Sequence, residues 1–136
     1  MSKAIGIDYG SKRIGISISD SSKIIATALT TVSRKEIFKY LINLFSKEEI
    51  DAIVVGQAKN LDGSDTNSSL EILDFIEKLK NLFPKVEINT IDERFTSKIA
   101  FQSIIDSGIK KKKRQNKSLI DQVSATIILQ DYLSYN

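Results

Sequence analysis

Residues 4–18 read AIGIDYGSKRIGISI: an apolar run ends on Asp8, a turn containing Gly10 follows, and isoleucines then alternate with small residues. Alternation with a period of two is typical of a β-strand, and a glycine within a polar turn favours reversal of the chain. The stretch therefore predicts a hairpin of two strands, with an acidic side chain at the end of the first strand.

Three further segments extend the predicted sheet. Residues 23–32 are rich in Ile, Ala, Thr and Val, which predicts a third strand of the same meander. Residues 51–56 are almost continuously apolar, as expected of a strand covered on both faces, and a fifth strand is marked by Val86, Ile88 and Ile91. The sequence thus predicts a five-stranded mixed sheet.

Helical spacing of apolar residues predicts the segments that cover this sheet. Residues 33–36 match a capping box, which predicts a helix start before an apolar face of Ile37, Phe38, Leu41, Ile42 and Phe45. After a turn-rich loop over residues 57–67, a second helix is expected to begin with apolar residues at helical spacing and to end before Pro84; these residues are Leu70, Leu73, Ile76 and Leu79.

Two more helices are expected near the end of the chain. One is capped by Thr96 or Ser97 and ends at Gly108. The other begins at Ser118, with an apolar face of Ile120, Val123, Ile127 and Ile128. The expected fold class is therefore α/β, a mixed sheet with helices on both faces, in a single domain over residues 1–136.

Composition restricts the chemistry more than the net charge of +3 does. The 136 residues include no cysteine and no histidine, so thiolate nucleophiles, Cys-based zinc sites and histidine general bases are excluded. Catalysis would have to use carboxylates, Lys, Tyr, hydroxyls or a cation bound by oxygen atoms. No apolar run approaches the roughly 18 residues of a membrane span, and no signal peptide is apparent, so we expect a cytoplasmic protein without a membrane partner.

Three acidic residues are candidates for a catalytic site: Asp8, Glu93 and Asp121. Asp8 could equally well shape a hairpin turn. Asp92 and Glu93 both follow a predicted strand, and since neighbouring strand residues point to opposite faces, only one of them is expected to join Asp8. Glu93 is the preferred one, although it could also pair with Arg94 at the surface or offset a helix dipole.

Asp121 has a structural explanation as well, because it follows Ser118 in a possible capping box. If Asp8, Glu93 and Asp121 converge, they would provide the hard oxygen ligands that Mg²⁺ or Mn²⁺ requires for phosphodiester hydrolysis. The chemistry expected of the three acids together is therefore that of a metal-dependent nuclease.

Basic residues gather close to these acids in the sequence. Five are consecutive, and another follows shortly after: Lys110, Lys111, Lys112, Lys113, Arg114 and Lys117. With Lys12, Arg13 and Arg94, they are candidate contacts to nucleic-acid phosphates, which would bind without reading the base sequence. The alternative is that the lysine run is only solvated surface.

Several motifs, in this order, resemble those of the YqgF family: Gly6–Gly15 (GIDYGSKRIG), Val54–Gly56, Asp62–Ser64, Asp92–Arg94 and Ile120–Gln122. Members of that family are known as candidate pre-16S rRNA nucleases and as Holliday junction resolvase-like proteins. The resemblance implies a ribonuclease H-like fold, maturation of the 5′ end of small-subunit ribosomal RNA, and a carboxylate metal site carried onto Asp8, Glu93 and Asp121. One departure is that Gln57-Ala58 stands where the family usually has Leu-Pro, and Leu61-Asp62-Gly63 where it has Met-Asp-Gly.

Other functions stay open at this level. Asp8-Tyr9-Gly10 with Gly15 also resembles the first phosphate loop of actin-like kinases, although those folds duplicate the domain and no second loop is present. A Holliday junction resolvase acting on branched DNA is a second alternative, and a non-catalytic RNA-binding module for ribosome assembly is a third. The expected partner is structured RNA such as pre-rRNA, and the expected state is a monomer or weak homodimer.

Overall fold

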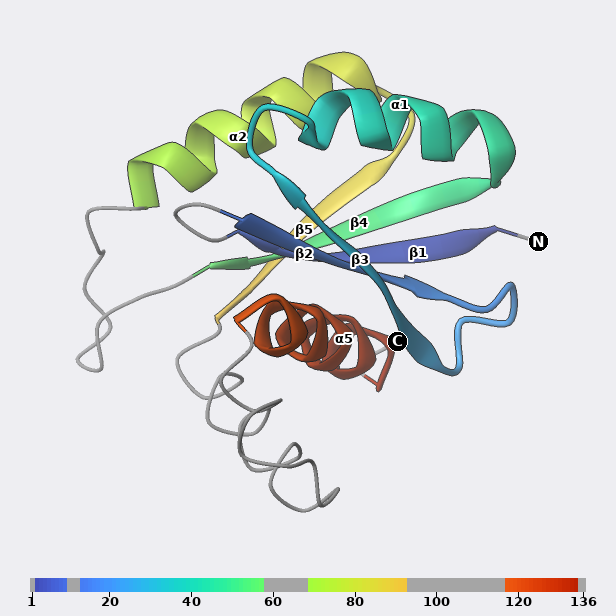
Figure 1. Cartoon of the computed structure of the whole chain (residues 1–136). Helices are drawn as coiled ribbons and strands as arrows, with labels where there is room; N and C mark the ends of the chain where they lie inside the picture. The colour runs from blue at the N-terminus through green and yellow to red at the C-terminus, as the bar shows by residue number, and fades with distance from the viewer. Residues whose placement is uncertain (1, 10–12, 58–68, 93–116, 135–136) are drawn as a thin grey trace.

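The structure is a computed structural model that describes residues 2–9, 13–57, 69–92 and 117–134. Five strands form one sheet with helices on both faces (Figure 1). The strands are β1 (Lys3–Tyr9), β2 (Arg13–Ser19), β3 (Ala26–Ser33), β4 (Ile50–Gln57) and β5 (Glu87–Asp92). The helices are α1 (Ile37–Lys47), α2 (Ser69–Leu82) and α5 (Lys117–Ser134). The predicted α/β class and mixed sheet are confirmed.

The sheet has the order β3-β2-β1-β4-β5, which places β1 at its centre. The first three strands form the predicted antiparallel meander, whereas β4 is parallel to β1 and β5 is parallel to β4. The isoleucines of the hairpin meet across the ladder, because Ile5 pairs with Ile18 and Ile7 with Ile16. The carboxyl ends of β1, β4 and β5 therefore lie at the same edge of the sheet.

The two faces of the sheet bury different kinds of side chain. Ile5 and Ile7 of β1 belong to a large aliphatic core with residues of α1 and α2, including Leu41 and Leu79. On the opposite face, Ala4 joins a smaller cluster with the α5 residues Ile128, Leu129 and Leu133. Figure 1 shows α1 and α2 on one side of the sheet and α5 alone on the other. Alternate residues of β1 thus point to α5 or to the α1 and α2 layer.

In two helices, the buried residues differ from those whose spacing predicts the helix. In α2, Leu70 and Leu73 are exposed, and the residues packed on the sheet are Ile72, Phe75, Ile76 and Leu79. In α5, Val123 and Ile127 are only half-buried, and the contact face consists of Ser124, Ala125, Ile128, Leu129 and Leu133. Small residues face the sheet in α5 because the helix lies very close to Gly6.

The third strand begins later than predicted. Lys23 has a left-handed backbone conformation, with φ of 58°, and the chain enters β3 only at Ala26. Asp20 stabilises this turn, because its Oδ1 accepts hydrogen bonds from the Ile24 N–H at 2.8 Å and the Ile25 N–H at 3.1 Å. The backbone bonds from Ile25 and Ile24 also hold the pKa of the Asp20 carboxyl below its usual value.

Strand β3 lies at an edge of the sheet and is not regular. Thr30 pairs with Ile16, but the next pair along the ladder joins Ser17 to Ala28, so Leu29 is an extra residue on β3. This arrangement is a β-bulge, which bends a strand and increases its local twist.

The predicted capping boxes are wrong at both helix starts that the structure describes. Ser33 is the last residue of β3, and α1 begins after Glu36, which makes no side-chain capping bond. Helix α5 already includes Lys117, so Ser118 lies inside its first turn. The helix predicted between residues 96 and 108 and most of the loop at 57–67 lie outside the described residues. Within the described part of the chain, no helix is long and apolar enough to cross a membrane.

Candidate active site

Asp8 lies near the carboxyl end of the central strand β1. It is half-buried, and its partners across the ladder are Gly15 on β2 and Gly56 on β4. Gly6, two residues earlier, lies against α5, and residues two apart in a strand share a face. The Asp8 carboxylate therefore projects from the face of the sheet that α5 covers.

Both cross-strand neighbours of Asp8 are glycines. Residues directly opposite one another in a sheet project their side chains to the same side, where they normally pack together. At this row of the sheet neither Gly15 nor Gly56 supplies a side chain. The Asp8 carboxylate therefore meets no side chain from either of its cross-strand neighbours.

Helix α5 crosses this face in the direction opposite to β1. Ala4 at the start of β1 packs in one cluster with Leu133, whereas a Cβ at Gly6 would lie 2.7 Å from the Ala125 carbonyl oxygen. The buried Ser17 hydroxyl donates a hydrogen bond of 2.7 Å to that same carbonyl oxygen, which fixes the helix on β2. One helical turn before Ala125 is position 121, so the backbone of α5 carries this position toward the Asp8 end of β1.

The other predicted site residues are only partly within the described structure. Glu93 directly follows β5, which ends at Asp92, and is itself outside the described residues, as are Lys12, Arg94, Lys110, Lys111, Lys112, Lys113 and Arg114. Asp121 and Lys117 belong to α5, but their side chains are outside the description. Among the described side chains, no three acids gather as a metal site. The convergence of Asp8, Glu93 and Asp121 stays a prediction.

Arg13 is the described member of the predicted phosphate contacts. It is half-buried at the start of β2, at the same end of the sheet as Asp8. Ser17 faces α5, and regular alternation through Gly15 puts Arg13 on that face too. A cationic side chain and the Asp8 carboxylate therefore share one face and one edge of the sheet.

A cluster of side chains that the sequence does not predict lies on the reverse face of β1. The Arg34 guanidinium lies over the Tyr9 ring, 4.5 Å from its centroid, and forms an ion pair of 2.8 Å with Glu71. The Tyr9 ring also packs on Phe75, with 4.6 Å between centroids. No local pattern could reveal these contacts, because Tyr9, Arg34 and the first turns of α2 are far apart in the sequence.

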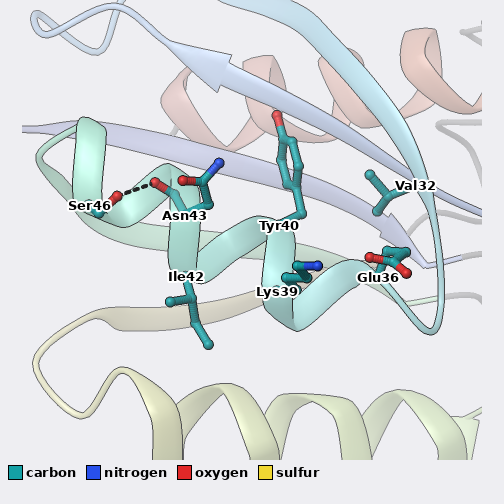
Figure 2. A pocket seen from close by; sticks show the side chains of 7 residues that line it. All are labelled: Val32, Glu36, Lys39, Tyr40, Ile42, Asn43 and Ser46. Atoms are coloured by element: carbon teal, nitrogen blue, oxygen red, sulfur yellow. Dashed lines mark hydrogen bonds between the residues drawn. The ribbon is translucent and has the colours of Figure 1, made fainter.

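A groove of about 660 Å³ lies elsewhere, along α1 and beside β3. Figure 2 shows its lining, with the Tyr40 ring extending from α1, and the residues are Val32, Glu36, Lys39, Tyr40, Ile42, Asn43 and Ser46. Burial raises the pKa of Tyr40. Among the described lining residues Glu36 is the one acid, so these residues do not offer the set of carboxylates that metal-dependent hydrolysis requires.

The strand order and the acid on the central strand define the class of protein as ribonuclease H-like. Two solved structures share this fold. The T. thermophilus RuvC in complex with a Holliday junction substrate matches with a TM-score of 0.59 and 15% identity, over 99% of this chain and 95% of that one. The Fowlpox virus resolvase, in complex with Holliday junction DNA, matches with a TM-score of 0.58 and 11% identity, over 98% and 97%. At these identities the likeness shows the fold alone.

The chain belongs to the RuvX family, described as Holliday junction resolvase, which matches residues 2–135. The resemblance to YqgF proteins is thereby confirmed. A relative from Flavobacterium psychrophilum is 48% identical over 134 residues, covering 98% of both chains. Another from Bacteroides thetaiotaomicron is 42% identical over 133 residues, covering 98% of this chain and 96% of the relative. Both relatives carry the name "Putative pre-16S rRNA nuclease".

Proposed function

We propose that this protein is a cytoplasmic nuclease that hydrolyses phosphodiester bonds during 5′-end processing of pre-16S rRNA. The observation that carries the proposal is the position of Asp8, an acid on the central strand of a RuvX-family chain, between two glycines and under α5. A phosphodiester can approach such a carboxylate closely without meeting a cross-strand side chain.

The proposed cofactor is Mg²⁺ or Mn²⁺, held by Asp8, Glu93 and Asp121. Carboxylate oxygens are the ligands that these ions prefer, and the chain has no cysteine or histidine to favour a softer metal. Neither cross-strand neighbour of Asp8 carries a side chain that would compete with the waters of such an ion. What a divalent ion supplies at such a site is activation of the attacking water and stabilisation of the leaving oxygen.

The alternation of β5 supports Glu93 over Asp92 as the second acid. Ile91 packs against the cluster beneath α5 and pairs with Gly56, the neighbour of Asp8. Since strand residues two apart share a face, position 93 is the one that an extension of β5 would carry to the α5 side.

The proposed role of the basic residues is to hold the substrate backbone. Arg13 shares its face and sheet edge with Asp8, and the run Lys110–Arg114 with Lys117 leads into α5. Contacts from these residues to phosphates would fix the register of an RNA strand without selecting its sequence.

Branched DNA is the second candidate substrate, because the family description names a Holliday junction resolvase. Relatives at 41–48% identity are named for pre-16S rRNA instead, which favours RNA for this chain. A junction resolvase would also need a two-fold symmetric dimer to cut paired strands, whereas processing of one RNA end works from a monomer. Incubation with a precursor rRNA fragment and with a four-way junction distinguishes the two.

The first prediction is that Asp8→Asn abolishes cleavage of structured RNA in Mg²⁺ or Mn²⁺ while leaving the fold intact. The amide preserves the size of the side chain but removes the negative charge that binds the ion, so we expect the rate to fall more than about 100-fold. Cleavage by the unaltered protein should also stop on addition of EDTA. Rates are measured on gels, and the fold by circular dichroism.

Asp51→Asn is the matched control. Asp51 lies near the start of β4, whereas Asp8 pairs with Gly56 near the end of that strand, and Asp51 forms an ion pair with Lys23 near the surface. This variant should therefore cleave at the normal rate. Undiminished cleavage by Asp8→Asn would rule out the proposed site. RNA binding without cleavage by the unaltered protein would instead support the non-catalytic module.

A further inference from the structure

The residue next to Asp8 is held by a set of side chains on the opposite face of the sheet. We call this set the Tyr9 cluster, and it consists of Tyr9, Arg34, Glu71 and Phe75. Arg34 lies over the Tyr9 ring at 4.5 Å and Phe75 packs on it at 4.6 Å, while Glu71 binds Arg34 at 2.8 Å. A guanidinium over an aromatic ring attracts it through the ring quadrupole, and its planar shape also allows close stacking.

The Tyr9 cluster joins three elements at one end of the molecule. Tyr9 ends β1, Arg34 lies in the turn between β3 and α1, and Glu71 is in the first turn of α2. The Arg34 side chain is 30% exposed, so its ion pair is partly shielded from solvent. Phe75 is the buried member of the cluster, and its ring centroid lies 5.5 Å from that of Phe38 on α1. A shift of Arg34 would therefore alter contacts in β1, in the turn between β3 and α1, and in α2.

Asp8 lies on the other face of β1, directly next to the Tyr9 cluster along the chain. Asp8 and Tyr9 are consecutive and point to opposite faces, so they share the peptide unit between them. Around Asp8, Gly15 and Gly56 contribute backbone pairing but no side-chain packing. The packing of Tyr9 therefore restrains the backbone of Asp8 from the face opposite to its carboxylate, in addition to the pairing with β2 and β4.

We propose that Arg34 is a positioning residue for Asp8, acting through Tyr9 and Glu71. The inference rests on the proposed function, since it assigns Asp8 to the reacting site. Arg34 stacks on the Tyr9 ring, which also packs on Phe75, and its ion pair with Glu71 links the end of β1 to the start of α2. These contacts keep the Asp8 carboxylate where it must bind the ion. Misplacement of a reacting group by about 1 Å can slow a reaction about 100-fold, so a remote tether of this kind has a measurable effect on the rate.

The test compares Arg34→Met with Lys3→Met. Lys3 is the matched control because, like Arg34, it is a partly exposed basic residue in an ion pair: its side chain is 31% exposed and lies 2.9 Å from Glu48. Lys3 begins β1 and therefore lies at the end of the strand away from Asp8. We expect Arg34→Met to lower kcat about tenfold and to raise the Mn²⁺ concentration for half-maximal rate, with the KM for RNA unchanged. Lys3→Met should stay within about twofold of the unaltered protein, the range expected when an exposed pair is lost.

Two further variants keep the test decisive. Arg34→Lys retains the charge but not the planar stack, so its kcat should lie between those of Arg34→Met and the unaltered protein. Glu71→Gln removes the ion pair with Arg34 by changing an exposed residue of α2. This variant should therefore fold even if Arg34→Met does not, and its kcat should also be lower than that of the unaltered protein. A raised KM with unchanged kcat would make Arg34 an RNA contact and overturn the inference.

A readout independent of activity separates this inference from the proposed function. Hydrogen exchange of the peptide covering Gly6–Tyr9 should become faster in Arg34→Met and Glu71→Gln, and should not change in Lys3→Met. If the unaltered protein cleaves nothing, the proposed function fails while faster exchange still supports the restraint on β1. Unchanged exchange in both variants overturns the role of Arg34 whatever the activity.

Discussion

Gly6 is the residue at which sheet and helix come closest. A Cβ atom there would lie 2.5 Å from Ser17 Oγ, 2.6 Å from Leu129 Cβ and 2.7 Å from the Ala125 oxygen. Two of these three neighbours belong to α5, which also carries position 121. The distance between α5 and β1, and with it the geometry of the acids on both, therefore depends on the missing side chain of Gly6.

The prediction at this scale is that Gly6→Ala destabilises the protein by about 1–3 kcal/mol, the usual cost of forcing an atom into a packed core. The free energy of unfolding is measured in urea. Ala28→Ser is the control, because it also adds one heavy atom but at an exposed position of β3, where the effect should stay within about 0.5 kcal/mol. Equal stability of Gly6→Ala and the unaltered protein would contradict the close approach of α5.

Single residues of the candidate site were predictable from the sequence to different degrees. Asp8 stood out because an apolar run ended on an acid beside glycines. Its partners Gly15 and Gly56 could not be recognised as neighbours, since only the register of the ladder brings them to the same row. The role of Arg34 could not be predicted from neighbouring residues, because its contacts are with Tyr9 and Glu71, which are distant in the sequence.

Helices show why a spacing pattern can select the wrong face. In α2, leucines at 70 and 73 fit helical spacing with Ile76 and Leu79, and so do Ile72 and Phe75. The two stripes overlap, and packing on the sheet selects the second, leaving Leu70 and Leu73 exposed. Periodicity located the helix and its end before Pro84, but not the side that is buried.

At the scale of this element, Ile72→Ala should cost about 2–5 kcal/mol and Leu73→Ala less than about 1 kcal/mol. Ile72 has no exposed surface, whereas Leu73 is 52% exposed, so only the first truncation leaves a cavity. Thermal and urea unfolding of the two variants provide the measurement, each serving as the control for the other. A larger loss of stability in Leu73→Ala than in Ile72→Ala would mean that the leucine side of α2 is the buried one.

The capping box at residues 33–36 failed because another element competed for the same residue. Ser33 ends β3, where it pairs with Arg13, and α1 begins only after Glu36, so Ser33 lies three residues too early in the chain to cap the helix. A strand ladder is a long-range interaction, and a local sequence pattern gives no information about it.

For the molecule as a whole, the order of apolar segments was enough to predict the architecture. Three alternating strands followed by alternating helices and strands leave few ways to cover both faces of a sheet. The mixed sheet and the helices on both faces are confirmed. The convergence of the three acids could not be derived in the same way, because it depends on distances between segments rather than on their order.

The basic run over residues 110–114 leads to a prediction about how RNA affinity depends on salt concentration. Replacing Lys110, Lys111, Lys112 and Lys113 by glutamine should weaken RNA binding and reduce the slope of log affinity against log salt by at least about 0.7, the contribution of one phosphate contact on a single strand. The control replaces four other exposed lysines, namely Lys47, Lys78 and Lys80 on α1 and α2 and Lys85 in the turn that follows α2. Titrations followed by fluorescence anisotropy measure both; equal losses would mean that only net charge matters.

The extra residue in β3 has a consequence for the protein at high concentration. Residues 26–33 contain no charge and no proline, so a regular strand of this composition at a sheet edge would be an open template for other chains. Leu29 breaks the spacing of the outward backbone groups, which disfavours pairing of a second strand along this edge. The irregularity thereby works against association of two molecules through their sheet edges.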